Sequence, residues 1–158
     1  MCFSATASFA AAAVLIPSGL YTIIKAQGTN PRHVPFAAFP LAFGVQQVFE
    51  GVVWLQMGGH TFLDQQAAAL GFTFFSHFFW LFWVPFSVWV LEREKTRKRV
   101  VLAVTLVGAL YGASLYVPLY FNDGWLDVVL LHESIDYRVK LVYDGVISQF
   151  SVRAIYAV

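Results

Sequence analysis

The chain has 158 residues, of which 59% are hydrophobic and 12% charged, and its formal net charge is +1. Soluble domains are about 45–50% apolar and about 25% charged, so this composition argues against an ordinary soluble fold and favours a membrane protein. The charges form no basic face suited to nucleic acid, and the single cysteine, Cys2, excludes an internal disulfide and a cysteine-based metal site.

Four stretches of the chain are long and apolar enough for membrane-spanning helices, which need roughly 20 mostly apolar residues. They cover about residues 5–24, 35–57, 66–91 and 100–121. The start of the chain, MCFSATASF, has neither a positively charged segment nor a clear cleavage site, so we interpret the first stretch as a retained helix rather than a signal peptide. We therefore predict an all-α integral membrane fold, with one membrane domain over residues 1–158.

Lysine and arginine residues gather in two of the loops between these spans. The loop at 92–99, EREKTRKR, holds five of them, the loop after the first span holds Lys25 and Arg32, and the loop after the second span holds none. Cytoplasmic loops carry an excess of such residues. We therefore predict a multi-pass protein of the cell membrane, with loop 92–99 in the cytoplasm and the N-terminus outside.

The segment at 122–145 is long for a connection between helices. From Tyr137 to Tyr143, alternate residues are apolar or aromatic, and this period of two is typical of a strand. Residues 128–132 could pair with this strand across residues 133–136, so we predict an outer β-hairpin near residues 125–144, with an irregular interfacial loop as the alternative. Residues 146–158 are expected to begin a fifth helix that is too short to span a membrane.

The second span carries a polar stripe. Gln46 and Gln47 precede Glu50 by four and three residues, which places all three side chains on one side of a helix. An ionisable residue within a span is costly and is usually paired or functional. Two interpretations remain open: hydrogen bonds that hold neighbouring helices together, or a site for a ligand, an ion or a proton.

His77 lies within the third span. Counted from the predicted outer ends of their helices, Glu50 and His77 differ in depth by about 6 Å, at ~1.5 Å per residue. Consecutive antiparallel helices usually pack together, so the two side chains could meet. A carboxylate beside an imidazole could relay protons, bind a cation or hold a metal. The alternative is an ordinary core histidine with satisfied hydrogen bonds.

Three further polar residues are predicted near the outer end. Ser4 and Ser8 are four residues apart at the start of the first span, where they could cap the helix or line the same cavity as Glu50. His132, in the predicted hairpin, could reach that cavity, as could Asp136 or Tyr137. The predicted ligand or proton site thus comprises Glu50, Gln46, Gln47, His77, Ser4, Ser8 and His132, with no metal assigned and no cofactor identified.

Two other features have structural interpretations. Gly108 and Gly112 form a GxxxG pattern in the fourth span, which is typical of a face that packs closely against another helix. The basic stretch EREKTRKR is interpreted as a solvated loop that sets the topology, with binding of anionic lipid as an alternative.

Four blocks of the sequence carry a family resemblance: MCFSATASF, FGVQQVFEGVVWL, SHFFWLFWVPFSVWVLE and LVYDG. In these blocks the chain resembles an uncharacterised family of bacterial multi-spanning membrane proteins, described only as a domain of unknown function. The resemblance implies further apolar helices, about seven in all, so this chain is expected to be the N-terminal part of a larger bundle. It implies no activity.

No motif in the sequence names a reaction. We expect a non-enzymatic membrane protein that handles a small solute, an ion or a proton, or that binds a ligand in its outer half. One alternative is a membrane-embedded, metal-dependent hydrolase, since serine, carboxylate and histidine loosely resemble the zinc sites of seven-helix hydrolases. That likeness is poor, because zinc sites normally have three protein ligands and only one histidine lies inside a span. The other alternative is a structural or assembly subunit. The expected partner is the lipid bilayer and not nucleic acid.

Overall fold

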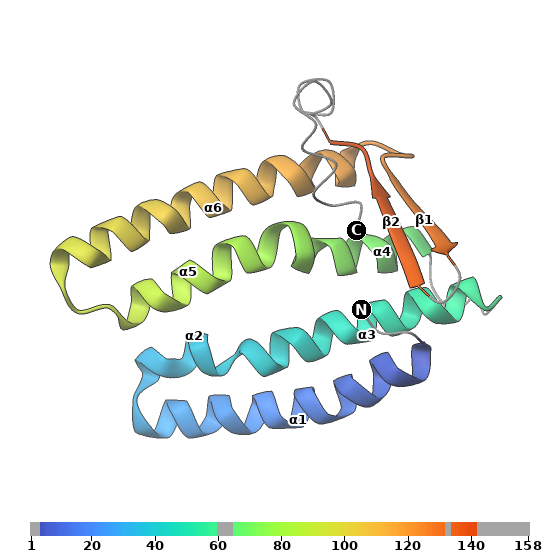
Figure 1. Ribbon diagram of the computed structural model, residues 1–158. Helices are drawn as coiled ribbons and strands as arrows, with labels where there is room; N and C mark the ends of the chain where they lie inside the picture. The colour runs from blue at the N-terminus through green and yellow to red at the C-terminus, as the bar shows by residue number, and fades with distance from the viewer. Residues whose placement is uncertain (1–3, 60–64, 132–133, 142–158) are drawn as a thin grey trace.

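The computed structural model describes residues 4–59, 65–131 and 134–141, and it is built mainly of helices (Figure 1). Four segments are long and apolar enough to cross a membrane. They are Ala5–Thr29, Pro31–Met57, Gln65–Leu91 and Lys95–Phe121. This confirms the predicted fold class of four apolar helices with a small antiparallel sheet. Helices of this length and composition suggest a multi-pass membrane protein.

The four segments divide into shorter elements. These elements are α1 (Ala5–Thr29), η1 (Pro31–His33), α2 (Val34–Ala37), α3 (Phe39–Met57), α4 (Gln65–Thr73), η2 (Phe74–Phe79), α5 (Trp80–Leu91) and α6 (Lys95–Phe121). In Figure 1 the long helices lie side by side in chain order, with α1 against α3 and α5 against α6. Each helix therefore packs chiefly on its neighbours in sequence.

Two irregular turns interrupt the helical segments. The second segment begins with η1, where the Asn30 side chain accepts a hydrogen bond from the Arg32 amide (3.1 Å) and Pro31 takes a position that needs no N–H. The third segment contains η2, a π-helical stretch between α4 and α5. A π-helical turn holds more residues than an α-helical turn, so it shifts the faces of the residues around it.

Glycines allow the close approach of neighbouring helices. A Cβ atom at Gly108 of α6 would overlap the carbonyl oxygen of Leu81, and one at Gly112 would lie 3.0 Å from the carbonyl oxygen of His77. The predicted close-packing face of the fourth span therefore contacts the backbone of η2 and α5. Between α1 and α3, a Cβ atom at Gly44 would lie 2.7 Å from the Ile16 side chain.

A hairpin follows α6. Strands β1 (Leu126–Leu131) and β2 (Ser134–Val139) pair antiparallel, from Leu126 opposite Val139 to Leu131 opposite Ser134. This confirms the predicted hairpin over an irregular loop but corrects its turn. The connection was expected at residues 133–136, yet residues 134–136 belong to β2. The reason is that the alternation of packed and outward side chains begins earlier, at Ile135. The predicted partial helix at 146–158 lies outside the described residues.

The hairpin lies over the ends of α3 and α4 (Figure 1). Leu126 and Ile135 are buried there against three residues of the two helices, Val53, Ala68 and Ala69. Burying a leucine or isoleucine side chain contributes about 1.5–3 kcal/mol. By contrast, α6 leaves many large apolar side chains exposed, among them Leu106 and Leu110, as expected for a surface that contacts lipid.

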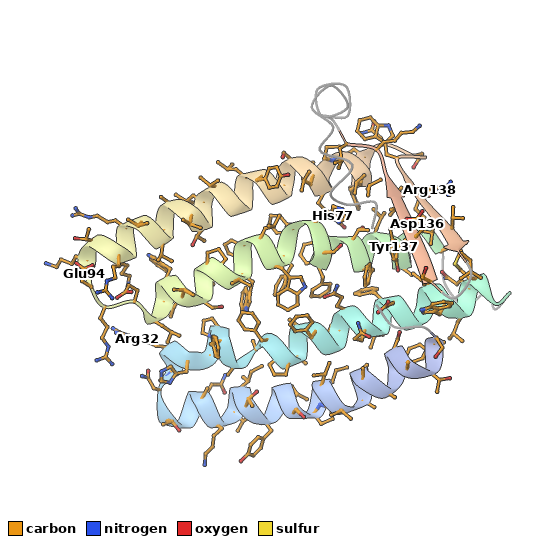
Figure 2. All side chains as sticks on the ribbon, viewed as in Figure 1. Arg32, His77, Glu94, Asp136, Tyr137 and Arg138 are labelled. Carbon is orange, nitrogen blue, oxygen red and sulfur yellow. The ribbon has the colours of Figure 1, made fainter. Side chains whose placement is uncertain are left out.

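Polar side chains mark the two ends of the helices. Figure 2 shows Arg32 and Glu94 at one end of the helices and Asp136, Tyr137 and Arg138 at the other. The two predicted basic loops therefore lie at the same end. This follows because two spans separate them in the sequence, and two spans return the chain to the side where it started.

The packing of α6 on α5 can be tested at Gly108. We expect Gly108→Ala to lower the free energy of unfolding by about 1–3 kcal/mol, because the added methyl group must displace a backbone carbonyl rather than a side chain. The measurement is unfolding of the purified protein in detergent. Gly28→Ala in α1 is the control, since a Cβ atom there has no neighbour within 4 Å. Equal effects at the two positions would contradict close packing at Gly108.

Candidate polar site beneath the hairpin

Glu50 is the buried acidic residue of α3. Its exposed fraction is only 2%, although glutamate is among the residues that are almost never fully buried unless paired. The Gln47 side-chain amide donates a hydrogen bond to Oε2 of Glu50 (2.9 Å). Val53, one turn further along α3, packs beneath the hairpin. The carboxyl group of Glu50 therefore lies one turn from the part of α3 that packs beneath β1 and β2.

Tyr137 approaches Glu50 from β2. Its ring stacks on Phe72 of α4, with ring centroids 4.7 Å apart and planes inclined by 13°. Its hydroxyl oxygen is buried and forms no hydrogen bond in the described part of the chain. Burial first, and then the negative charge of Glu50, raise the pKa of Tyr137 well above its usual value. The hydroxyl therefore keeps its proton and remains available as both a donor and an acceptor.

Gln46 has a different partner from the rest of the predicted stripe. Its side-chain oxygen accepts a hydrogen bond from the indole N–H of Trp80 in α5 (2.8 Å). The indole ring of Trp80 also stacks on Phe43 of α3, with centroids 4.1 Å apart. Gln46 thus joins two helices, as the first interpretation of the stripe predicted.

His77 does not join Glu50. Its Nδ1 atom lies 2.9 Å from the hydroxyl oxygen of Ser76, its neighbour in η2. Figure 2 places His77 between η2 and α6, and its carbonyl oxygen lies against Gly112 of α6. Among the described residues, no hydrogen bond or ion pair connects His77 with Glu50. Residue counting estimated how deep Glu50 and His77 lie, but not the direction in which each side chain leaves its helix. In the structure the two side chains have different neighbours.

The serines of α1 bond within their own helix. The Ser4 hydroxyl accepts a hydrogen bond from the Ala7 amide (3.2 Å), which makes Ser4 the N-cap, and the Ser8 hydroxyl donates to the Ser4 carbonyl (3.3 Å). Asp136 forms an exposed ion pair with Arg138 (3.1 Å). His132 lies outside the described residues.

The candidate site is therefore smaller than the sequence suggested. The structure brings together Glu50, Gln47 and Tyr137, with Gln46 one turn away in a contact between helices. Within residues 4–59, 65–131 and 134–141, no group of three or more His, Cys, Asp and Glu side chains is placed to hold a metal ion. Sequence reasoning named Tyr137 as one of several residues able to reach Glu50, but it missed Trp80, whose contact spans 34 positions.

The Gln46–Trp80 hydrogen bond can be tested by a double-mutant cycle. Gln46→Met and Trp80→Phe each remove one partner, and we expect a coupling energy of about 0.6–1.7 kcal/mol, the range for polar contacts between membrane helices. The measurement is the free energy of unfolding of the four proteins. The cycle of Gln47→Met with Trp80→Phe is the control and should show coupling near zero. Equal coupling in both cycles would contradict a specific bond to Gln46.

Comparison with known proteins gives a family but no activity. No curated protein and no solved structure matches the chain. The sequence profile of a family of unknown function, DUF6629, matches residues 1–149. The chain therefore belongs to this family of unknown function, DUF6629.

Proposed function

We propose that this protein is a non-enzymatic, multi-pass membrane protein that moves a proton or a small cation by binding it at Glu50, beneath the hairpin. The observation that carries the proposal is the burial of an acidic side chain within an apolar helix that is long enough to span a membrane. Such residues mark ion and proton pathways in membrane proteins.

The burial of Glu50 is costly when its side chain is ionised. Moving a carboxylate out of water costs several kcal/mol unless a positive charge or a proton neutralises it. The hydrogen bond from the Gln47 side-chain amide orients the carboxylate. A bound proton or cation would neutralise the carboxylate and so lower the free-energy cost of burying it. The same stabilisation would make the proton or cation bind more tightly.

The hydroxyl group of Tyr137 favours a proton or cation site at Glu50 over a contact that serves packing alone. A buried hydroxyl without a hydrogen bond is costly, by about 1–3 kcal/mol. Phenol and carboxylate oxygens can both bind a hard cation directly or through water. The hairpin that supplies Tyr137 also covers the ends of α3 and α4, so its position would control access to Glu50 from this end.

The proposal includes an orientation. The basic loop 92–99 would lie in the cytoplasm, because positively charged loops are retained there. The hairpin and Glu50 would then face the outer side of the cell membrane. The position of Tyr137 and Glu94 at opposite ends of the helices supports this arrangement (Figure 2).

The test of Glu50 is a flux measurement. The whole chain is reconstituted in vesicles that contain a dye sensitive to the ion under test, and separate gradients of H⁺, Na⁺ and K⁺ are applied. We expect flux of at least one of these ions above that of empty vesicles, and a loss of roughly tenfold or more in Glu50→Gln, which keeps the shape but cannot ionise. Asp127→Asn is the control, because Asp127 is an exposed carboxylate in the same hairpin.

Two results would contradict this role of Glu50. One is a wild-type protein that moves none of the three ions. The other is a Glu50→Gln variant that keeps its flux and changes only its melting temperature, which would assign Glu50 to interhelical hydrogen bonding.

The role of the Tyr137 hydroxyl is tested by Tyr137→Phe. Because this hydroxyl forms no hydrogen bond in the described part of the chain, its removal should leave the free energy of unfolding unchanged or raise it, by up to about 1–3 kcal/mol. Ion flux should nevertheless fall. Tyr120→Phe is the control, because Tyr120 is an exposed tyrosine of α6. Wild-type flux in Tyr137→Phe would remove the hydroxyl from the site.

A further inference from the structure

A cleft lies where α5 ends and α6 begins. This is the end of the molecule where Figure 2 labels Glu94, opposite the hairpin. Its volume is about 260 Å³, and it is lined by Trp89, Lys95, Lys98, Arg99 and Leu102. The last four residues follow a spacing of three or four along α6, so they form one face of that helix. Trp89 completes the wall from the last turn of α5.

In the part of the chain that the structure describes, no acidic side chain forms an ion pair with the cations of this cleft. Glu94 is engaged elsewhere, because its carboxylate caps α6 by accepting hydrogen bonds from the Thr96 and Arg97 amides (2.8 and 2.6 Å). These bonds lower the pKa of Glu94 and keep it ionised, and its carboxylate also forms an ion pair of 4.0 Å with Arg97. Across the described residues, the side chains of Lys95, Lys98 and Arg99 form no ion pair. The cleft therefore carries an uncompensated positive charge.

The position of the cleft favours a lipid over a soluble anion. The Lys98 ammonium lies 5.0 Å from the centre of the Trp89 ring, and tryptophan at the end of a span is typical of the lipid headgroup region. From the cleft, exposed apolar side chains continue along the same face of α6, from Leu102 to Leu106. A molecule with an anionic head and an apolar chain can contact both parts, whereas free phosphate can contact only the first.

We propose that this cleft binds the headgroup phosphate of an anionic phospholipid, with Lys95, Lys98 and Arg99 as the groups that contact the phosphate. The acyl chain would follow Leu102 and Leu106. A phosphatidylcholine headgroup fits less well, because its own ammonium group would lie against the three cations. This site is independent of Glu50, which packs near the hairpin at the other end.

The test measures lipid preference of the whole chain in detergent. The protein is mixed with equal amounts of phosphatidylglycerol and phosphatidylcholine that have identical acyl chains, and bound lipid is counted by native mass spectrometry. We expect a preference for phosphatidylglycerol that falls by on the order of tenfold or more in the triple variant Lys95→Gln, Lys98→Gln, Arg99→Gln, since each cation near an anionic surface contributes severalfold. The three side chains are exposed or half-buried, so the melting temperature should stay close to that of the wild type.

The control variant removes three cations from the same end but outside the cleft, Arg32→Gln, Arg93→Gln and Arg97→Gln. It should keep most of the preference. Equal losses in the two triple variants would show diffuse attraction and overturn the site. So would the absence of any preference in the wild type. Complete displacement of the lipid by excess inorganic phosphate would assign the cleft to a soluble anion instead.

Discussion

The candidate site depends on the packing of the β1–β2 hairpin on the ends of α3 and α4. Leu126 and Ile135 reach the helices because Ala68 and Ala69 have small side chains, which let the strands approach closely. The period of two in β2 then fixes the direction of its other residues. With Ile135 facing the helices, Tyr137 must face them too, while Asp136 points outward to Arg138. One apolar contact thus places a buried hydroxyl group close to a buried acid.

The two ends of the molecule differ in whether their charged side chains are buried or exposed. At the hairpin end, an acidic side chain is buried, and Gln47 and Tyr137 are among its neighbours. At the other end, basic side chains stay exposed in the loop region, where water or lipid phosphate can compensate them. Between the ends, glycine contacts hold α6 close to α5 without any charge. The separation lets each end be altered with little effect on the other.

The fold was predictable from sequence because its signals are local. Hydropathy over roughly 20 residues identifies a span. The period of two from Tyr137 to Tyr143 predicted a second strand, and its first three residues, 137–139, belong to β2. Contacts around the helix axis were not predictable, because they depend on how each helix is rotated against its neighbour. His77 illustrates this limit: its depth was estimated from residue counting, but it lies in the π-helical stretch η2, where counting by α-helical turns fails. The hairpin turn was misplaced because Ile135 was not counted in the alternation.

Under the proposed function, the polar stripe of α3 combines both of its interpretations, and the two depend on each other. Gln46 and Glu50 are four residues apart and share a face of the helix. The bond from Trp80 to Gln46 ties that face to α5, which limits the rotation of α3 about its axis. With the rotation fixed, Glu50 takes its place one turn nearer the hairpin, toward Tyr137. A neutral side chain that joins two helices therefore positions the ionisable one, and the proposed site needs both residues for different reasons.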